Sequence, residues 1–390
     1  MKSLILNENS LRNSNGVKKI LVLYAKSGFM GHMVIAQNYA ALLEKAGYEV
    51  RLGDAFQLDG KTEVKTGNAL YFWVIKNAPW IWQALYMGWL HIPGAHFFKN
   101  RILPTRFKQT QKFILSEKPD AIVTTHPVAT STVNYLKMKK KYTGPLFTTF
   151  SDYHTQPFHV YKGTDKFFLV TPEQIDDLIK LGIPKEKAMV PGILVSEKYY
   201  NIPTKEEARK QLNLPGDKTI ILVMGGGKGW GIDKTIKTLA NLKNPALAII
   251  VGGSDERRNE IELKIKNYES RIVTFQVTGF IEPSLYFAAA DLLISKPGGL
   301  TSTQAFLLKL PLLATSPLPG QEDINIRYLL AKGAIALEDK KGFSRQIDEL
   351  ISSPEKLREI AENAYKLAPV DAPRIVLETI KNALYSSNDN

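Results

Sequence analysis

Residues 291–325 place two short apolar segments around a glycine turn and a helical pattern, DLLISKPGGLTSTQAFLLKLPLLATSPLPGQEDIN. Strands are predicted at 292–295 and 310–314, and a helix is expected to open at 301–303. This alternation favours an open α/β sheet, in which loops at the carboxyl ends of neighbouring strands line one crevice. The glycine turn gathers free backbone N–H groups at a helix N-terminus, which suits an anion. The polar stretch PLPGQEDIN suits a hydroxyl-rich ligand, so we expect a pocket for a nucleoside diphosphate that carries a sugar.

The same alternation runs through most of the chain. An unbroken apolar strand at 18–24 leads into a helix that ends at Gly47, and a second strand at 48–52 completes a βαβ start. Further strands are predicted at 120–124, 145–150, 219–224, 246–251 and 272–275. A chain of 390 residues is expected to form two or three domains. We therefore predict two doubly wound sheets with a linker inside 196–217.

The composition excludes several classes of protein. The chain has no cysteine, so it has neither disulfides nor thiolate metal sites, and nothing favours an oxidising compartment. The N-terminal apolar run is too short for a signal peptide, and no uncharged run reaches the roughly 20 residues that span a bilayer. These features predict a protein of the cytoplasm.

The positive charge lies mostly in the first half of the chain. The formal net charge is +13, and residues 1–200 hold 26 Lys and Arg against 15 Asp and Glu, whereas residues 201–390 hold 25 against 23. An anionic partner is therefore expected for the first half. The alternative is that this charge only keeps the protein in solution.

An aromatic and basic segment at 71–106 interrupts the α/β pattern. Between residues 61 and 116 there are eight basic residues and one acid, Glu63. Mixed rings and cations are typical of segments that lie at an anionic membrane surface. The side chains predicted to contact the acceptor or the membrane are Trp73, Trp80, Trp82, Trp89, Arg101 and Arg106. Stacking on RNA bases and a buried helix pair are the alternatives, but single-strand-binding motifs are absent and we expect no nucleic-acid partner.

Two residues of the first half are candidates for acid–base chemistry. His32 is predicted in the first turn of the first helix, and Asp152 follows a predicted strand together with His154 and His159. Ends of strands are where α/β folds place chemistry, although a single histidine is often structural. All six histidines lie in this half, but no HExxH pair occurs, so we expect no metal site.

The glycine turn GGGKGWG, which begins at Gly225, follows another predicted strand. It lacks the Gly-Lys-Ser/Thr ending of a P-loop and the GxGxxG spacing of a dinucleotide fold. It is predicted only to bring backbone close to a phosphate or to the neighbouring domain.

Two motifs identify a family resemblance. SKPGGLTSTQA and PLPGQEDIN are similar to the KPGGLTxxEA and PxPGQExxN motifs of the diacylglycerol glycosyltransferase and monogalactosyldiacylglycerol synthase group of glycosyltransferase family 28. The GH pair at 31–32, SDYH, GGGKG and TGF at 278–280 add to the resemblance, which spans roughly residues 18–365. The N-acetylglucosaminyltransferase that makes lipid II is a more distant relative of this group.

The resemblance implies a GT-B architecture of two Rossmann-like domains that face each other across a cleft. Residues 17–198 would form the domain that binds the lipid acceptor and the membrane, and residues 205–365 the domain that binds the UDP-sugar donor. Residues 366–390 would form a C-terminal helix that packs back on the first domain.

The resemblance also implies roles for individual residues. His32 would be the catalytic base and Asp152 its orienting carboxylate or a second base, while Phe280 would contact the uracil. The other predicted donor-binding residues are Gly225, Gly226, Gly227, Gly298, Gly299, Leu300, Thr301, Gln304, Gln321, Glu322 and Asn325. Gln304 replaces the ribose-binding Glu of the family motif, and GFMGH replaces the usual GGGH, so the sequence departs from the family at two binding positions.

The implied reaction is inverting transfer of a hexose from a UDP-sugar to diacylglycerol, with glucose favoured over galactose. The chain has no Asp-x-Asp motif, so we expect neither a metal nor any other cofactor. One alternative is transfer of N-acetylglucosamine to a polyprenyl-linked or other lipid. Another is a catalytically silent protein that binds sugar nucleotides. The expected location is the cytoplasmic face of the membrane, with peripheral attachment, and the oligomeric state is not predicted.

Overall fold

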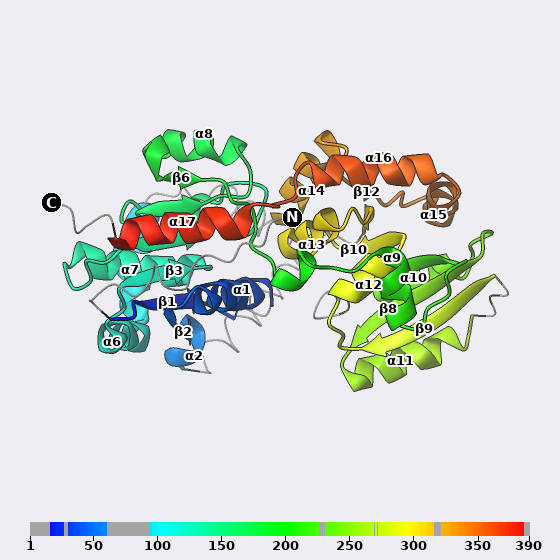
Figure 1. Ribbon diagram of the computed structural model, residues 1–390, viewed down its shortest axis with the longest axis horizontal. Helices are drawn as coiled ribbons and strands as arrows, with labels where there is room; N and C mark the ends of the chain where they lie inside the picture. The colour runs from blue at the N-terminus through cyan, green and yellow to red at the C-terminus, as the bar shows by residue number, and fades with distance from the viewer. Residues whose placement is uncertain are drawn as a thin grey trace. The chain divides into compact units, whose positions relative to one another are not determined.

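The computed structural model describes residues 16–26, 30–60, 94–225, 229, 231–268, 270, 272–315 and 321–385, without the side chain of Gln321. The chain divides into two compact units, one of residues 1–195 with 369–390 and one of residues 196–368 (Figure 1). Each unit contains one six-stranded sheet in which every described pairing is parallel. The predicted fold class of two doubly wound α/β domains is therefore confirmed. The roles predicted for the domains stay predictions.

The sheet of the first unit has the strand order β2-β1-β3-β4-β5-β6. Its strands are β1 (Lys19–Tyr24), β2 (Glu49–Asp54), β3 (Ala121–Thr124), β4 (Leu146–Thr149), β5 (Lys166–Phe168) and β6 (Ala188–Met189). All residues of β3 and β4 are buried. Strands that are covered on both faces consist of continuous apolar or uncharged residues. Short runs of this kind were therefore the signal that predicted these strands.

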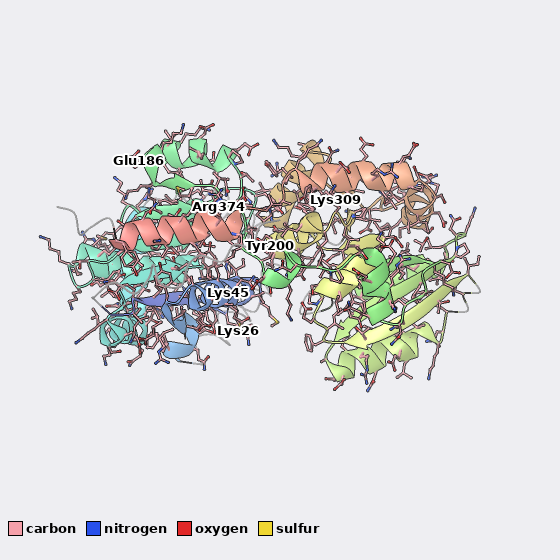
Figure 2. The ribbon with its side chains drawn as sticks, in the orientation of Figure 1. Lys26, Lys45, Glu186, Tyr200, Lys309 and Arg374 are labelled. Carbon is pink, nitrogen blue, oxygen red and sulfur yellow. The ribbon has the colours of Figure 1, made fainter. Side chains whose placement is uncertain are left out.

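Helices connect these strands in the first unit. They are α1 (Gly31–Lys45), α2 (Ala55–Leu58), α5 (Ala95–Phe97), η3 (Phe98–Ile102), η4 (Leu103–Arg106), α6 (Lys108–Glu117), α7 (Pro127–Met138), η5 (Pro157–His159), α8 (Glu173–Lys180) and η6 (Lys185–Lys187). The last helix of the chain, α17 (Ala372–Tyr385), belongs to this unit, and Figure 2 marks Arg374 on it. Gly192, with φ at +81°, lies so close to Pro369 that an added Cβ would come within 2.5 Å of the proline ring.

The sheet of the second unit has the strand order β12-β11-β10-β7-β8-β9. Its strands are β7 (Thr219–Met224), β8 (Ala246–Gly253), β9 (Val273–Gly279), β10 (Leu292–Ser295), β11 (Leu312–Ala314) and β12 (Ala336–Leu337). Its helices are η7 (Glu197–Tyr199), α9 (Lys205–Gln211), α10 (Ile232–Leu239), α11 (Asp255–Ile265), α12 (Ser284–Ala289), α13 (Gly299–Leu307), α14 (Gln321–Ala331), α15 (Phe343–Ile351) and α16 (Pro354–Tyr365).

Three predicted boundaries in the second unit were wrong, two of them around the glycine turn after β10. The helix expected to open at 301–303 begins at Gly299, directly after β10. The strand expected at 310–314 begins only at Leu312, because Lys309 takes a left-handed φ of 51° and Leu310 still donates to the Ala305 carbonyl of the helix. The strand expected at 272–275 continues to Gly279 and so ends next to Phe280.

Among the described residues, no helix has both the length and the apolar character needed to cross a bilayer.

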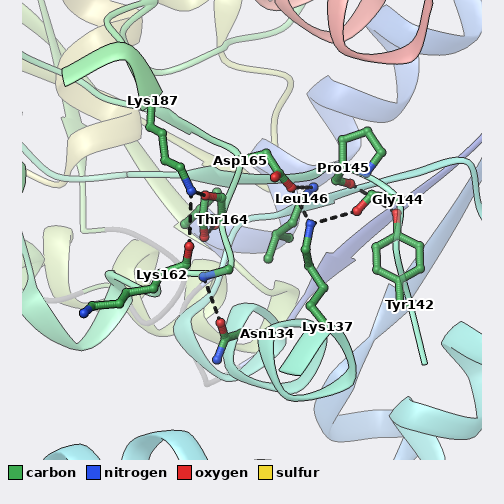
Figure 3. Close-up of polar contacts among 12 residues, drawn as sticks. Asn134, Lys137, Tyr142, Gly144, Pro145, Leu146, Lys162, Thr164, Asp165 and Lys187 are labelled. Carbon is green, nitrogen blue, oxygen red and sulfur yellow. Dashed lines mark hydrogen bonds and ion pairs between the residues drawn. The ribbon is translucent and has the colours of Figure 1, made fainter. Parts of the chain in front are cut away.

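An aspartate before a strand forms the same two-point contact at three places. The amides of Asp120, Asp165 and Asp291 donate to the carbonyls of Lys19, Leu146 and Ile220, at 2.8, 2.9 and 2.8 Å. Each carboxylate then accepts from the amide of that same residue, at 2.8, 2.7 and 2.8 Å. We call these contacts the aspartate clamps, and Figure 3 shows the clamp of Asp165 on Leu146.

A basic side chain completes each aspartate clamp. Lys18 pairs with Asp120 at 2.9 Å, and Lys137 pairs with Asp165 at 2.5 Å. Arg209 of α9 pairs with Asp291 at 2.6 Å and also donates to the carbonyls of Ala289 and Gly216. The clamps hold the amino ends of β1 and β3, of β4 and β5, and of β7 and β10, so they set the register of paired strands at the edge where the strands begin.

Removing one clamp should destabilise its unit. We expect Asp291→Ala to lower the free energy of unfolding by about 3 kcal/mol, because the guanidinium of Arg209, only 9% exposed, loses its carboxylate. Asp291→Asn retains an oxygen acceptor for the Ile220 amide and should cost about 1–2 kcal/mol. Urea unfolding measures both values, and hydrogen exchange in β7 and β10 shows where protection is lost.

The matched control is Asp233→Ala, since Asp233 also pairs with basic residues but its side chain is 51% exposed. It should change the free energy of unfolding by less than about 0.5 kcal/mol. Equal effects of the Asp233 and Asp291 substitutions would contradict the role assigned to the clamp.

Candidate functional site

The carboxyl ends of three neighbouring strands bring the predicted catalytic residues together in the first unit. β1, β3 and β4 are adjacent, and the chain after them carries His32, His126 and Asp152 respectively. Lys26, labelled in Figure 2, is the last described residue after β1 and before residue 30. The rings of His32 and His126 meet edge to face, with centroids 4.9 Å apart. The loops of this sheet edge therefore converge as an α/β fold requires.

His32 has the electrostatic environment of a neutral base. It lies in the first turn of α1, as predicted, and its carbonyl accepts a hydrogen bond of 3.0 Å from the Thr125 hydroxyl. Burial lowers the pKa of His32 below its ordinary value of 6.5, and the negative charge of Asp152 opposes this shift. The imidazole is therefore uncharged at neutral pH and can accept a proton.

Two further histidines of this region, His126 and His159, were not among the predicted site residues. His126 caps α7 by accepting from the Val128 amide, and His159 of η5 is 4% exposed. Burial holds the pKa of each well below 6.5, and protonation of His32 would lower it further. Both histidines follow predicted strands in the sequence. Their position after a strand is the feature by which the sequence could have indicated a role for them.

In the second unit the turn after β10 leads directly into the N-terminus of α13. Gly298 is the N-cap of α13, and no described side chain caps the helix. The first-turn amides of Gly299, Leu300 and Thr301 therefore have neither a helical acceptor nor a side-chain acceptor among the described residues. No described atom lies within 4 Å of a Cβ added to Gly298. The turn thus fits the predicted binding of a diphosphate, which stays a prediction.

A buried ion pair joins this turn to the next predicted binding segment. Lys296 Nζ lies 2.8 Å from Glu322 Oε1, and the two side chains are only 14% and 7% exposed. Asn325, one turn further along α14, is fully buried. The carboxylate predicted to bind sugar hydroxyls is therefore oriented by a lysine that the sequence analysis did not select, although Lys296 stands inside the SKPGG motif.

The remaining predicted donor residues lie at different places along the same sheet edge. Gly225 follows β7, next to the end of β10, where the Ser295 hydroxyl donates to the Met224 carbonyl at 2.8 Å. Gln304 is 8% exposed on α13. Phe280 follows the edge strand β9 and is 70% exposed, and its ring lies 3.6 Å from a Cβ built on Gly253. Phe280 is thus separated from the turn after β10 by β8 and β7.

Several predictions lie outside the described residues: Gly226, Gly227, the side chain of Gln321, and Trp73, Trp80, Trp82 and Trp89. Of the predicted membrane contacts, Arg101 and Arg106 are described, and both are exposed. Phe97 and Ile102 beside them are 63% and 43% exposed. Within the described ranges, His, Asp and Glu nowhere form a group of three that could hold a metal ion.

Comparison with known proteins divides the chain at nearly the same place as the two compact units. Residues 32–195 match the family model described as monogalactosyldiacylglycerol (MGDG) synthase, and residues 204–367 match that of glycosyl transferases group 1. The chain is 23% identical over 371 residues to the processive diacylglycerol beta-glucosyltransferase of Bacillus licheniformis, covering 94% of this chain and 95% of that protein. It is 26% identical over 352 residues to the enzyme of the same name from Bacillus cytotoxicus, covering 88% of each.

The fold has a clear counterpart among solved structures. Acinetobacter baumannii MurG superposes with a TM-score of 0.62 at 16% identity, over 94% of this chain and 99% of that one. Two Rossmann-like units with these matches define a glycosyltransferase of the GT-B class. More narrowly, residues 32–195 are similar to the monogalactosyldiacylglycerol synthases, and nearly the whole chain is similar to the diacylglycerol glucosyltransferases.

The Lys296–Glu322 pair leads to a prediction about the second unit. Lys296→Met should lower its free energy of unfolding by about 3 kcal/mol, because Glu322 would remain buried without this cation. Replacing both residues by Met should recover most of the stability but not the binding of UDP-sugar. Urea unfolding and titration calorimetry with UDP-glucose measure the two effects.

Lys309→Met is the matched control, because Lys309 pairs with Glu362 at the surface, where the side chains are 50% and 57% exposed. It should leave both the stability and the binding nearly unchanged. Full UDP-glucose affinity in the double variant would show that Glu322 does not contact the donor.

Proposed function

We propose that this enzyme transfers glucose from UDP-glucose to diacylglycerol with inversion at the anomeric carbon. The observation that carries the proposal is the uncharged, partly buried His32 beside Asp152, in a chain similar over 94% of its length to a processive diacylglycerol beta-glucosyltransferase. Inverting transfer needs one displacement, hence a base for the acceptor hydroxyl and no covalent nucleophile.

On the acceptor side, His32 takes the proton of the lipid hydroxyl as the oxygen attacks the anomeric carbon. Asp152 then stabilises the imidazolium, since its charge raises the pKa of His32. Burial has the opposite effect and keeps His32 unprotonated before the reaction. The two effects together suit a base that is neutral at rest and charged only in the transition state.

On the donor side, the bond between the anomeric carbon and UDP breaks, and negative charge develops on the diphosphate. The uncapped amides of Gly299, Leu300 and Thr301 and the dipole of α13 would stabilise that charge. We therefore propose transfer without a metal ion or other cofactor. Phe280 would stack on the uracil, and Gln304 would hydrogen-bond the ribose.

The sugar hydroxyls would be recognised by Gln321, Glu322 and Asn325 at the start of α14. Glucose is favoured because the similar Bacillus proteins are named glucosyltransferases, whereas the family model of residues 32–195 is named for a galactosyl product and keeps galactose as a second candidate.

We further propose peripheral attachment to an anionic membrane surface on the cytoplasmic side. Its support in the described residues is the exposed group of Phe97, Phe98, Ile102, Arg101 and Arg106 on α5, η3 and η4. Exposed rings and aliphatic chains enter the headgroup region, and the arginines add electrostatic attraction to anionic lipid.

The transfer assay combines purified protein, diacylglycerol vesicles and a panel of labelled UDP-sugars. We expect glucosyl transfer, which His32→Ala should reduce about a thousandfold while UDP binding stays within about twofold. For the wild type, kcat/KM should fall as the pH drops through the lowered pKa of His32 and stay level above 6.5, because only the neutral imidazole accepts a proton.

The same assay separates the alternatives. Transfer only from UDP-N-acetylglucosamine to a polyprenyl-linked lipid would replace both donor and acceptor in the proposal. Binding of UDP without transfer from any donor would identify a silent sugar-nucleotide-binding protein. Near-normal turnover of the His32 variant would remove His32 as the base.

Membrane attachment is tested by vesicle sedimentation. Phe97→Ser with Ile102→Ser, and separately Arg101→Glu, should each weaken binding to phosphatidylglycerol vesicles about tenfold. Binding of the wild type should weaken with salt and be slight on neutral vesicles. Ile179→Ser on α8, where Ile179 is 47% exposed, is the control and should bind normally. Equal loss in the control would contradict a specific membrane face.

A further inference from the structure

Three imidazoles share one region of the first unit. His126 lies between two rings, since its centroid is 4.9 Å from that of His32 and 5.7 Å from that of Phe56. His159 packs on Phe150 with centroids 5.1 Å apart. A proton on His32 would lower the pKa of both other histidines, and the charge of Lys99 lowers the pKa of His159 as well. The negative charge of Asp152 acts on His32 and raises its pKa.

The hydrogen bond to α7 fixes which nitrogen of His126 carries the proton. The Val128 amide donates to His126 Nδ1 at 3.2 Å, so Nδ1 must hold a lone pair and the neutral ring carries its proton on Nε2. Protonation of this neutral ring would add a proton at Nδ1, break the cap and place a positive charge at the positive end of the helix dipole. His126 is therefore held in its neutral form by the fold.

The His32 ring depends on this neutral neighbour for its orientation. Within the described part of the chain, the buried Nδ1 atom of His32 has no hydrogen-bond partner. A histidine that acts as a base usually has its second nitrogen tied by a hydrogen bond, which sets the ring angle. Here the edge-to-face contact with His126, at an interplanar angle of 83°, is the described interaction that can set that angle.

We propose that His126 is a positioning residue, which holds the His32 ring in one orientation and excludes water from it. The proposal rests on the proposed function, since it takes His32 as the base. In the step itself, the acceptor O–H proton passes to His32 while the acceptor oxygen bonds to the anomeric carbon. The electron pair of the broken bond leaves with the UDP oxygen. His126 takes no part in the transfer of the proton.

Two substitutions separate positioning from simple capping. His126→Asn retains an acceptor that caps α7 well but removes the ring. His126→Phe retains a ring against His32 but removes the cap. If His126 mattered only as the cap, the Asn variant would behave like the wild type and the Phe variant would be impaired. If His126 positions His32, the Asn variant should disturb His32 and the Phe variant should leave His32 close to the wild type.

NMR titration of the His32 ring in the absence of substrates gives the first measurement, with His32→Ala used to assign the signal. In His126→Asn water gains access to the ring, so the pKa of His32 should rise toward 6.5, whereas in His126→Phe it should remain lowered. An unchanged pKa of His32 in the Asn variant would overturn the proposal. This measurement needs no turnover, so it stays decisive even if the chain transfers no sugar.

Kinetics give the second measurement. His126→Asn should lower kcat about tenfold to a hundredfold with the KM for UDP-glucose unchanged, and the acid limb of its pH profile should move to higher pH. His126→Phe should retain more of kcat than the Asn variant, although its thermal midpoint falls by a few degrees because the cap is lost. A normal kcat and an unshifted profile in a stable Asn variant would overturn the proposal. Absence of transfer in the wild type, with the NMR shift present, would overturn only the proposed function.

Discussion

The aspartate clamps are the interaction on which the geometry of both sheets depends. Asp120, Asp165 and Asp291 each bind both the amide and the carbonyl of one residue on the neighbouring strand, which a shift in register would break. In a parallel sheet all strands run the same way, so a register held at the amino edge also determines where the strands end at the other edge. The carboxyl edge, where the candidate residues lie, is positioned by contacts that take no part in the chemistry.

The two edges of each sheet use charge differently. At the amino edge a carboxylate meets a lysine or arginine, and the pair stabilises the fold. At the carboxyl edge of the first unit the histidines are kept uncharged by burial, and a neutral group can still gain a proton. At the carboxyl edge of the second unit's sheet, the buried Glu322 requires Lys296, because burying a carboxylate without a cation is energetically costly.

The sequence predicted features that depend on local patterns. Continuous apolar runs located most strands, and the position of His32 after one of them placed it correctly in the first turn of α1. The contact between His32 and His126 was not predictable, because it requires β1 and β3 to be neighbours although 94 residues of sequence separate the two histidines. The pair of Lys296 and Glu322 likewise depends on the adjacency of β10 and β11. Strand order is a property of the whole sheet, and local periodicity does not carry it.

Gln304 illustrates how burial can explain a departure from a family motif. The motif has Glu at this position, but here the side chain is 8% exposed on the helix that opens at the proposed diphosphate site. An ionised carboxylate at that depth would need a cation partner, and it would add negative charge close to the phosphate. An amide avoids both costs and still offers one acceptor and two donors to a ribose hydroxyl. The substitution would therefore weaken one hydrogen bond to the proposed donor but leave the proposed anion site electrostatically intact.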